Sequence, residues 1–133
     1  MSKIRVLLVD DSPEFLKMAT QFLATVQEID PVGVALTGQD ALVLVAGLQP
    51  DLILMDLVMP EMNGLDATRH IKAMPDPPIV IILTGHDTPE YRSAAATAGA
   101  DGFIHKPKLF DELLPLMRRL TTFSTERNEN DDH

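Results

Sequence analysis

The stretch that decides the fold is IRVLLVDD at residues 4–11, a mainly apolar run that ends in two aspartates. Short apolar runs of this kind are typical of strands buried on both faces of a parallel sheet. Three further runs repeat the pattern and close on a polar residue: DLILMD at 51–56, IVIILT at 79–84 and GFIHK at 102–106. Ligands of open parallel sheets bind beyond the carboxyl ends of the strands. The pattern therefore predicts one polar site at that edge.

Stretches with helical periodicity separate these runs. Residues 12–27 place apolar side chains at i, i+3, i+4 and i+7, with Ser12 suited to the N-cap and Pro13 to the first turn. The same alternation predicts a strand at 32–36 and helices at 38–48, 65–73, 89–98 and 109–120. Five such units predict an α/β fold, a doubly wound parallel sheet with helices on both faces.

Composition indicates a single globular domain. Of the 133 residues, 45% are hydrophobic and 23% charged, and no apolar run approaches the roughly 20 residues that a membrane helix needs. The first strand begins almost at once, which leaves no room for a signal peptide, and the chain has no cysteine for disulfides or thiolate metal sites. We expect a cytoplasmic protein with a folded domain at 1–121 and a disordered acidic tail at 122–133.

The net charge of −9 argues against nucleic acid as a partner. Four acidic residues and one arginine give residues 122–133 a charge of −3, so −6 remains on the folded part by subtraction. Nucleic-acid binders usually carry a basic stripe, and the sequence has none. We therefore expect no direct DNA binding and no membrane association.

The acidic residues at the predicted edge favour a metal ion. Asp10 and Asp11 follow the first strand and Asp56 ends the third. Carboxylates held close together raise one another's pKa unless a cation lies between them. Magnesium prefers oxygen ligands and is usually bound by one or two carboxylates together with phosphate oxygens. The sequence therefore predicts a Mg²⁺ site made by these three residues.

The same edge holds the groups that phosphoryl transfer requires. An aspartate can attack phosphorus and form an aspartyl phosphate, which is the role we predict for Asp56. The reaction depends mainly on positioning and on positive charge around the phosphoryl oxygens. Lys106 offers that charge, and the hydroxyl of Thr84 can donate a hydrogen bond to a phosphoryl oxygen.

With these residues in place, the chain resembles the receiver domain of bacterial two-component response regulators over residues 3–120. The matching segments occur in the family's order: DD at 10–11, MDLVMPEMNG at 55–64, TG at 84–85 and GADGFIHKP at 99–107. The resemblance implies a flavodoxin-like fold with strand order 2-1-3-4-5. This order places the first and third strands side by side beneath the acidic residues.

The resemblance also implies roles and partners. Asp56 would accept a phosphoryl group from a phosphohistidine on a sensor histidine kinase or a histidine phosphotransfer protein. Val58 would give a backbone carbonyl to the magnesium, while Thr84 and Phe103 would move together as the switch. The face made by the fourth helix, fifth strand and fifth helix would then control a downstream protein or an output domain, and it could also support a dimer. Such a response regulator promotes only its own phosphorylation and dephosphorylation and is not a conventional enzyme.

Three other functions remain to be weighed. An aspartate-nucleophile phosphatase generally needs a second aspartate two residues after the first, and Val58 stands there. A dinucleotide- or flavin-binding protein would carry Gly-x-Gly-x-x-Gly after the first strand, where residues 10–13 read DDSP. A receiver-like module that never meets phosphate would not need the acidic, threonine and lysine positions intact. Since Val58 offers no group that orients water, we also expect slow self-dephosphorylation.

Three backbone expectations concern single residues. The resemblance favours a cis peptide bond before Pro107. Pro115 falls inside the fifth predicted helix, where it removes a hydrogen bond, so we expect a kink that alters the output face. Gly64 is interpreted as a residue that permits a positive φ angle in a turn.

Overall fold

The computed structural model describes residues 3–131, with side chains as far as residue 121. Its centre is a five-stranded parallel sheet in the order β2-β1-β3-β4-β5. The strands are β1 (Ile4–Val9), β2 (Ile29–Ala35), β3 (Leu52–Asp56), β4 (Ile79–Thr84) and β5 (Gly102–His105). The helices are α1 (Pro13–Thr25), α2 (Gly38–Leu48), α3 (Gly64–Lys72), α4 (Pro89–Ala98) and α5 (Leu109–Asp131). The predicted flavodoxin-like fold and strand order are confirmed.

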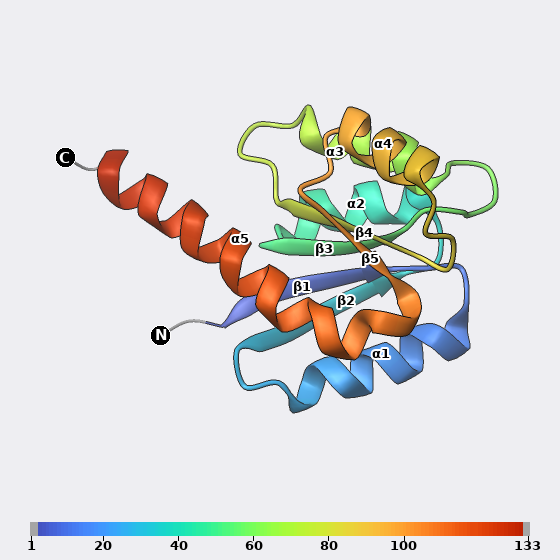
Figure 1. Cartoon of the computed structure of the whole chain (residues 1–133), viewed down its shortest axis with the longest axis horizontal. Helices are drawn as coiled ribbons and strands as arrows, with labels where there is room; N and C mark the ends of the chain where they lie inside the picture. Colours follow the sequence, from blue (N-terminus) through green and yellow to red (C-terminus); the bar gives the residue numbers. More distant parts are fainter. Residues whose placement is uncertain (1–2, 132–133) are drawn as a thin grey trace.

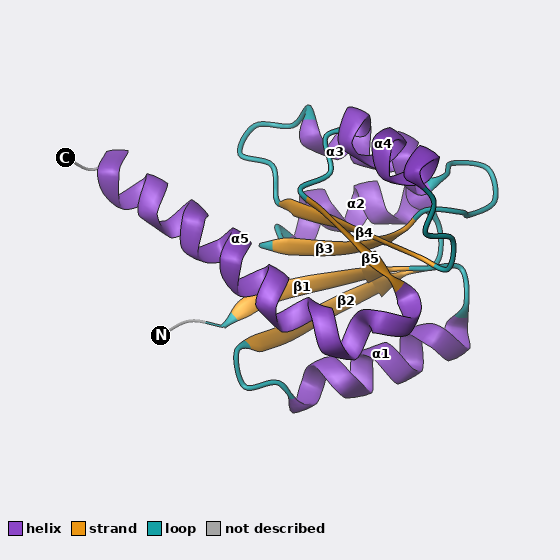
Figure 2. Ribbon diagram, in the orientation of Figure 1, coloured by secondary structure: helices purple, strands orange, loops and turns teal. Residues whose placement is uncertain are grey.

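Helices cover both faces of the sheet (Figures 1 and 2). Along β1, Val6 and Leu8 point into a core shared with α1 and α5, whereas Leu7 and Val9 point into a second core beneath α2, α3 and α4. All four side chains are at most 2% exposed. Both faces of the strand therefore bury apolar surface, which explains why its sequence is a continuous apolar run rather than an alternating one.

Side-chain caps fix the starts of the helices near the carboxyl edge of the sheet. The capping side chains of α1, α2, α3 and α4 belong to Ser12, Thr37, Asn63 and Thr88, and each accepts a hydrogen bond from a backbone N–H of the first turn. These bonds satisfy donors that a helix start otherwise leaves free. The predicted N-cap at Ser12 is confirmed, and α1 begins immediately beside the paired aspartates.

Strand β2 begins earlier than the sequence predicts. It starts at Ile29 and runs through Pro31, which lies outside the predicted strand at 32–36. The pairing with β1 shifts there, so that Val6 lies opposite Pro31 and Leu7 opposite Gly33. Proline is tolerated because β2 is an edge strand and the register is irregular at this point.

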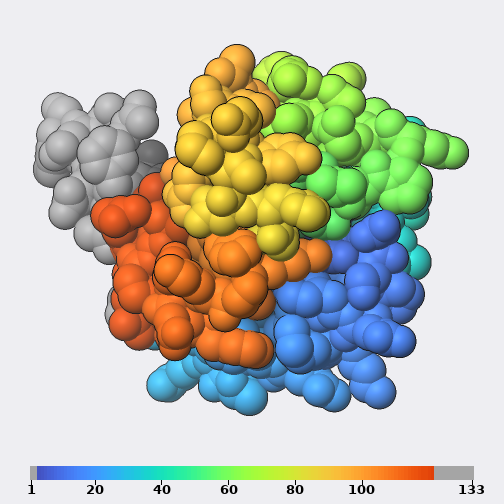
Figure 3. Space-filling model, turned by 45° about the vertical axis from the view of Figure 1, so that its right-hand side comes forward, coloured from blue at the N-terminus to red at the C-terminus, as the bar shows by residue number. Residues whose placement is uncertain are grey.

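The segment after β5 corrects one backbone prediction. All peptide bonds that the structure describes are trans, so the predicted cis bond before Pro107 is wrong. Lys106–Lys108 form the 3-10 helix η1, with the proline in its first turn. In that position the fixed φ angle of proline fits and its missing N–H is not needed. Figure 3 shows that this segment (orange) meets the start of α1 (blue) on the surface.

Helix α5 is longer than the sequence predicts. Its backbone remains helical to Asp131, beyond the expected end near residue 120, because residues 116–131 contain neither proline nor glycine. Helix α5 continues through Pro115 without a break. The expected kink at Pro115 and its effect on the output face stay predictions. The division of the chain at residue 121 also stays a prediction, and residues 132–133 lie outside the described part. None of the helices in residues 3–131 is long and apolar enough to cross a membrane.

Candidate functional site

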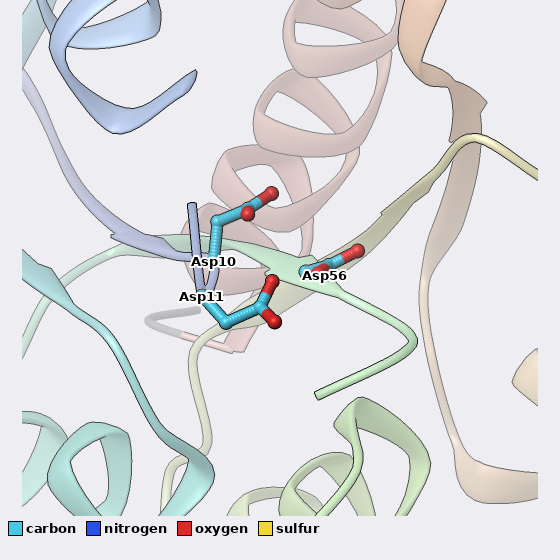
Figure 4. Close-up of side chains that lie close together, drawn as sticks. All are labelled: Asp10, Asp11 and Asp56. Atoms are coloured by element: carbon cyan, nitrogen blue, oxygen red, sulfur yellow. The ribbon is translucent and has the colours of Figure 1, made fainter. Parts of the chain in front are cut away.

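Three carboxylates meet at the carboxyl edge of the sheet. Asp10 and Asp11 follow β1, and Asp56 is the last residue of the neighbouring strand β3. Each contributes an oxygen that lies within 4.8 Å of the oxygens of the other two. Figure 4 shows their side chains side by side. Asp10 and Asp56 are buried and Asp11 is exposed, so the group is open to solvent on one side.

Burial raises the pKa of the Asp56 carboxyl group. Its residue is 5% exposed, and burial, followed by the negative charge of Asp10, raises the pKa of Asp56 to about 6. The positive charge of Lys106 opposes this shift without cancelling it. At neutral pH the carboxylate is therefore mostly ionised, but at a free-energy cost that a cation beside it would reduce.

Lys106 brings one positive charge to the carboxylates. It begins η1, and its Nζ lies 2.6 Å from Oδ2 of Asp10 and 3.5 Å from Oδ1 of Asp56. Burial by itself would lower the pKa of Lys106, but its contacts with the two carboxylates outweigh burial and raise that pKa overall. The lysine thus stays protonated and touches the two buried acids.

The donor set fits a hard divalent cation. Oδ2 of Asp10 is buried and, among the described residues, receives no hydrogen bond of good geometry; its contact with Lys106 is a charge contact. Three carboxylates face one ammonium, which leaves a surplus of negative charge at the edge. Mg²⁺ in proteins binds carboxylate oxygens and keeps several waters, so a negatively charged and partly exposed group of carboxylates suits it. A carbonyl ligand from Val58, whose side chain is half-exposed, stays a prediction.

Gly64 holds the loop after β3 close to Asp56. A β-carbon at this position would lie 1.9 Å from the backbone oxygen of Asp56, and the Gly64 N–H donates to the carbonyl of Leu57 over 2.9 Å. The interpretation as a positive-φ residue is wrong, because the positive φ angle of this loop belongs to Glu61 at 65°. Glycine is required here because the backbone of α3 approaches the strand end too closely for any side chain.

The structure places the two predicted switch residues on adjacent strands. Thr84 ends β4 directly after Leu83, which pairs with Asp56, and its buried Oγ1 accepts a hydrogen bond from the N–H of His86 over 3.1 Å. Phe103 lies on β5 and packs partly against the second core. The Arg92 guanidinium sits over its ring, 4.6 Å from the centroid. A joint movement of Thr84 and Phe103 stays a prediction.

Two residues near the site were missed by the sequence analysis. Phe15 was assigned only to the apolar face of a helix, but its ring lies 4.5 Å from Nζ of Lys106. Arg92 received no role, although it contacts Phe103 and also pairs with Asp87, 2.6 Å from Nε to Oδ1. The contact of Phe15 with Lys106 joins segments about 90 residues apart, and periodicity within a helix carries no signal for the contacts that Arg92 makes with residues outside α4.

Comparison with known proteins agrees with this geometry. A family model described as the response regulator receiver domain matches residues 6–118. A protein-glutamate methylesterase/protein-glutamine glutaminase of Methanococcus maripaludis is 42% identical over 108 residues, which cover 80% of this chain and 30% of that protein. The response regulator MprA of Mycolicibacterium vanbaalenii is 34% identical over 125 residues, or 92% of this chain and 52% of that protein. The chain thus spans between about a third and a half of these relatives.

Solved structures give the same result. The response regulator domain of Thermotoga maritima CheB superposes with a TM-score of 0.81 at 30% identity, covering 88% of this chain and 95% of that one. The receiver domain of the Arabidopsis thaliana histidine kinase CKI1, complexed with Mg²⁺ and BeF₃⁻, gives 0.75 at 32% identity and covers 90% of each chain. The fold and the family match agree, and the chain belongs to the response regulator receiver domains of two-component systems.

Proposed function

We propose that this chain is a phosphorylation-controlled switch in which Asp56 accepts a phosphoryl group with the help of Mg²⁺. The observation that carries the proposal is the position of Asp56: a buried carboxylate at a strand end, beside two other carboxylates and within 3.5 Å of a lysine. Such a group is nucleophilic when ionised, and Lys106 together with an ion held by the carboxylates would complement the charge of a transferring phosphoryl group.

The residues divide the chemistry between them. An oxygen of Asp56 forms the new bond to phosphorus while the bond from phosphorus to the donor's imidazole nitrogen breaks and the donor keeps that electron pair. Asp10, Asp11 and Asp56 would hold the ion, which supplies positive charge to the phosphoryl oxygens. Lys106, which contacts Asp10 and Asp56, would supply further positive charge.

Thr84 and Phe103 would convert this chemistry into a change of surface. The Thr84 hydroxyl accepts from the His86 N–H in the structure, and a phosphoryl oxygen on Asp56 would give it a stronger, charged partner. Moving Thr84 would release the β4–α4 loop and give Phe103 a new neighbour. We propose that this rearrangement changes the face formed by α4, β5 and α5, and that phosphorylation shifts the population between two conformations.

The partners follow from the same proposal. The phosphoryl donor would be a phosphohistidine on a sensor histidine kinase or a histidine phosphotransfer protein, and the changed face would control a downstream protein or an output domain. The α4-β5-α5 face could also form a dimer. The chain itself would catalyse only its own phosphorylation and dephosphorylation. The methylesterase name of one relative describes a protein of which this chain matches 30%.

The lifetime of the phosphoryl group depends on the residue at position 58. Val58 is 52% exposed beside the site and has no group that can orient an attacking water. We propose that self-dephosphorylation is slow for this reason. Val58→Asn should accelerate the loss of phosphate, measured by intact mass after the donor is removed, and an unchanged rate would contradict the idea.

Intact-mass spectrometry tests the central proposal. The protein is incubated with acetyl phosphate, with and without Mg²⁺, beside Asp56→Asn and the control Asp51→Asn, which changes an exposed aspartate just before the start of the same strand. We expect one phosphoryl group on the wild type and on the control, only with Mg²⁺, and none on Asp56→Asn. A wild type that remains unmodified, also with a phosphorylated histidine kinase as donor, would overturn the proposal.

A further inference from the structure

We propose that Phe15 is a positioning residue whose aromatic ring holds the Lys106 ammonium against the carboxylates. The inference deepens the proposed function and rests on it, because it concerns the lysine that would contact the transferring phosphoryl group. It follows from a contact between the first turn of α1 and the segment after β5, two parts of the chain that meet on the surface in Figure 3.

The geometry is that of a cation–π interaction. Nζ of Lys106 lies 4.5 Å from the centroid of the Phe15 ring, well within the distance at which the face of an aromatic ring attracts a cation. Phe15 is half-buried and packs against the core between the sheet, α1 and α5. The ring is therefore held by packing, and the lysine is positioned against it.

A closed series of contacts links this ring to the acidic residues. The N–H of Ser12 donates to Oδ1 of Asp10 over 2.9 Å, and the N–H of Phe15 donates to Oγ of Ser12 over 3.2 Å. The ring of Phe15 contacts Nζ of Lys106, and that Nζ lies 2.6 Å from Oδ2 of Asp10. The same cap that starts α1 thus orients both the metal-site carboxylate and the ring that faces the lysine.

An aromatic ring is suited to this position for a chemical reason. It attracts the ammonium but has no lone pair to accept an N–H bond in competition with an oxygen. The lysine, which is 24% exposed in its side chain, keeps its N–H groups for Asp10, Asp56 and an incoming phosphoryl oxygen. Without the ring, water and alternative rotamers would compete for the ammonium, so that fewer molecules would be ready for the reaction.

The same helix offers a matched control. Phe22 is also partly buried in the first core, but its ring packs on Phe110, with centroids 4.6 Å apart and planes at 85°. Phe22→Leu removes an aromatic ring from α1 and costs packing energy without touching Lys106. A comparison of Phe15→Leu with Phe22→Leu therefore separates the position of the lysine from the general packing of the helix.

The first measurement is spectroscopic and does not depend on phosphorylation. Protons above an aromatic ring shift upfield, so the ε-methylene protons of Lys106 should resonate upfield of those of the other lysines in the wild-type NMR spectrum. The shift should disappear in Phe15→Leu and remain in Phe15→Tyr and Phe22→Leu. A wild-type Lys106 without an upfield shift, or a shift that survives in Phe15→Leu, would overturn the proposal even if Asp56 is phosphorylated.

The second measurement is the rate of phosphorylation by acetyl phosphate with Mg²⁺, followed by intact mass. We expect Phe15→Leu to be slower by about two- to fivefold, as the strength of an accessible cation–π contact implies. Phe15→Tyr should restore the wild-type rate, and Phe22→Leu should keep it. An equal loss in Phe15→Leu and Phe15→Tyr, or no loss in Phe15→Leu, would overturn the inference. Failure of the wild type to react would instead contradict the proposed function, while the NMR result would still decide the contact.

Discussion

The parallel strands have a lysine–aspartate cluster at each end: one at their amino ends, called the amino edge, and one at their carboxyl ends, called the carboxyl edge. The two clusters differ in how completely their polar atoms are paired. At the amino edge, Oδ2 of Asp101 accepts from Nζ of Lys72 and from the N–H of Val80, both over 2.8 Å. The same Nζ also donates to the carbonyl of Pro78 over 3.0 Å. At the carboxyl edge, one lysine faces three carboxylates, and among the described residues the ion pair with Lys106, at 2.6 Å, is the contact that the buried Oδ2 of Asp10 makes.

We interpret the amino-edge cluster as a structural contact and the carboxyl-edge cluster as the functional site. The amino-edge cluster ties the end of α3 to the starts of β4 and β5 with balanced charge and paired donors. The carboxyl-edge cluster keeps more negative charge than its single lysine neutralises. In the proposed function, a bound cation would neutralise this surplus before an anionic phosphoryl group approaches. Equivalent changes at the two edges should therefore have different effects on stability and function.

The largest contrast is expected when each lysine loses its charge. Lys106→Met should slow phosphorylation by acetyl phosphate about 100-fold or more, because a preorganised positive group beside the transferring phosphoryl is removed. Lys72→Met should react at a rate within about twofold of the wild type, since it acts only through the fold. Rates come from intact mass over time. Similar losses in both variants would contradict the contrast.

The second contrast concerns pH and uses the raised pKa of Asp56. With its folded-state pKa at about 6 and an unfolded value near 4, the folded protein binds this proton more tightly, so stability falls as pH rises through that window. Asp56→Asn has no such proton to lose. Its advantage in free energy of unfolding over the wild type should grow by roughly 2–3 kcal/mol between pH 4 and pH 7.

Urea unfolding of both proteins with EDTA present measures this difference, since EDTA removes any bound Mg²⁺. Adding Mg²⁺ at pH 7 should recover part of the loss in the wild type, because the ion binds the folded, ionised site. A difference between the two proteins that does not change with pH would mean that Asp56 is not strained by burial.

A smaller effect is expected at the amino edge. Asp101→Ala leaves the Val80 N–H without its side-chain acceptor and the Lys72 ammonium with only the carbonyl of Pro78, and it should lower the free energy of unfolding by about 1–2 kcal/mol. The phosphorylation rate should not change, because the cluster lies at the other end of the strands. Urea unfolding and the acetyl phosphate assay test both statements, and a slower reaction with unchanged stability would reverse the assignment.

The smallest effect is expected for an exposed ion pair that lies outside both clusters. Arg118 and Glu28 form an exposed pair, with 2.6 Å between Nη2 and Oε1, which belongs to neither cluster. Exposed ion pairs gain little because water and salt screen them. Arg118→Ala should therefore leave the urea midpoint and the phosphorylation rate unchanged. A clear loss of stability would show that paired charges on this surface matter more than their exposure implies.

The strands and most helices could be predicted because their signals are local. The runs that form β1, β3 and β4 are apolar on both faces, and Ser12, Pro13 and Gly99 mark helix ends by their own backbone and capping chemistry. Errors arose where tertiary context decides. Pro31 is accepted only because β2 is an edge strand, and Pro107 stays trans because a 3-10 helix forms there.

The sequence by itself determined the alternation of strands and helices and the polar residue at each strand end, because burial on both faces and the parallel connection impose that pattern. Only the tertiary structure decided which groups touch. It placed Lys106 nearer to Asp10 than to Asp56, and it set the ring of Phe15 against that lysine. It also required a glycine at position 64 for close approach to the strand end. The contacts of Lys106 join residues far apart in the chain, and the approach of Gly64 to Asp56 depends on the path of the loop between them, so local periodicity carries a signal for neither.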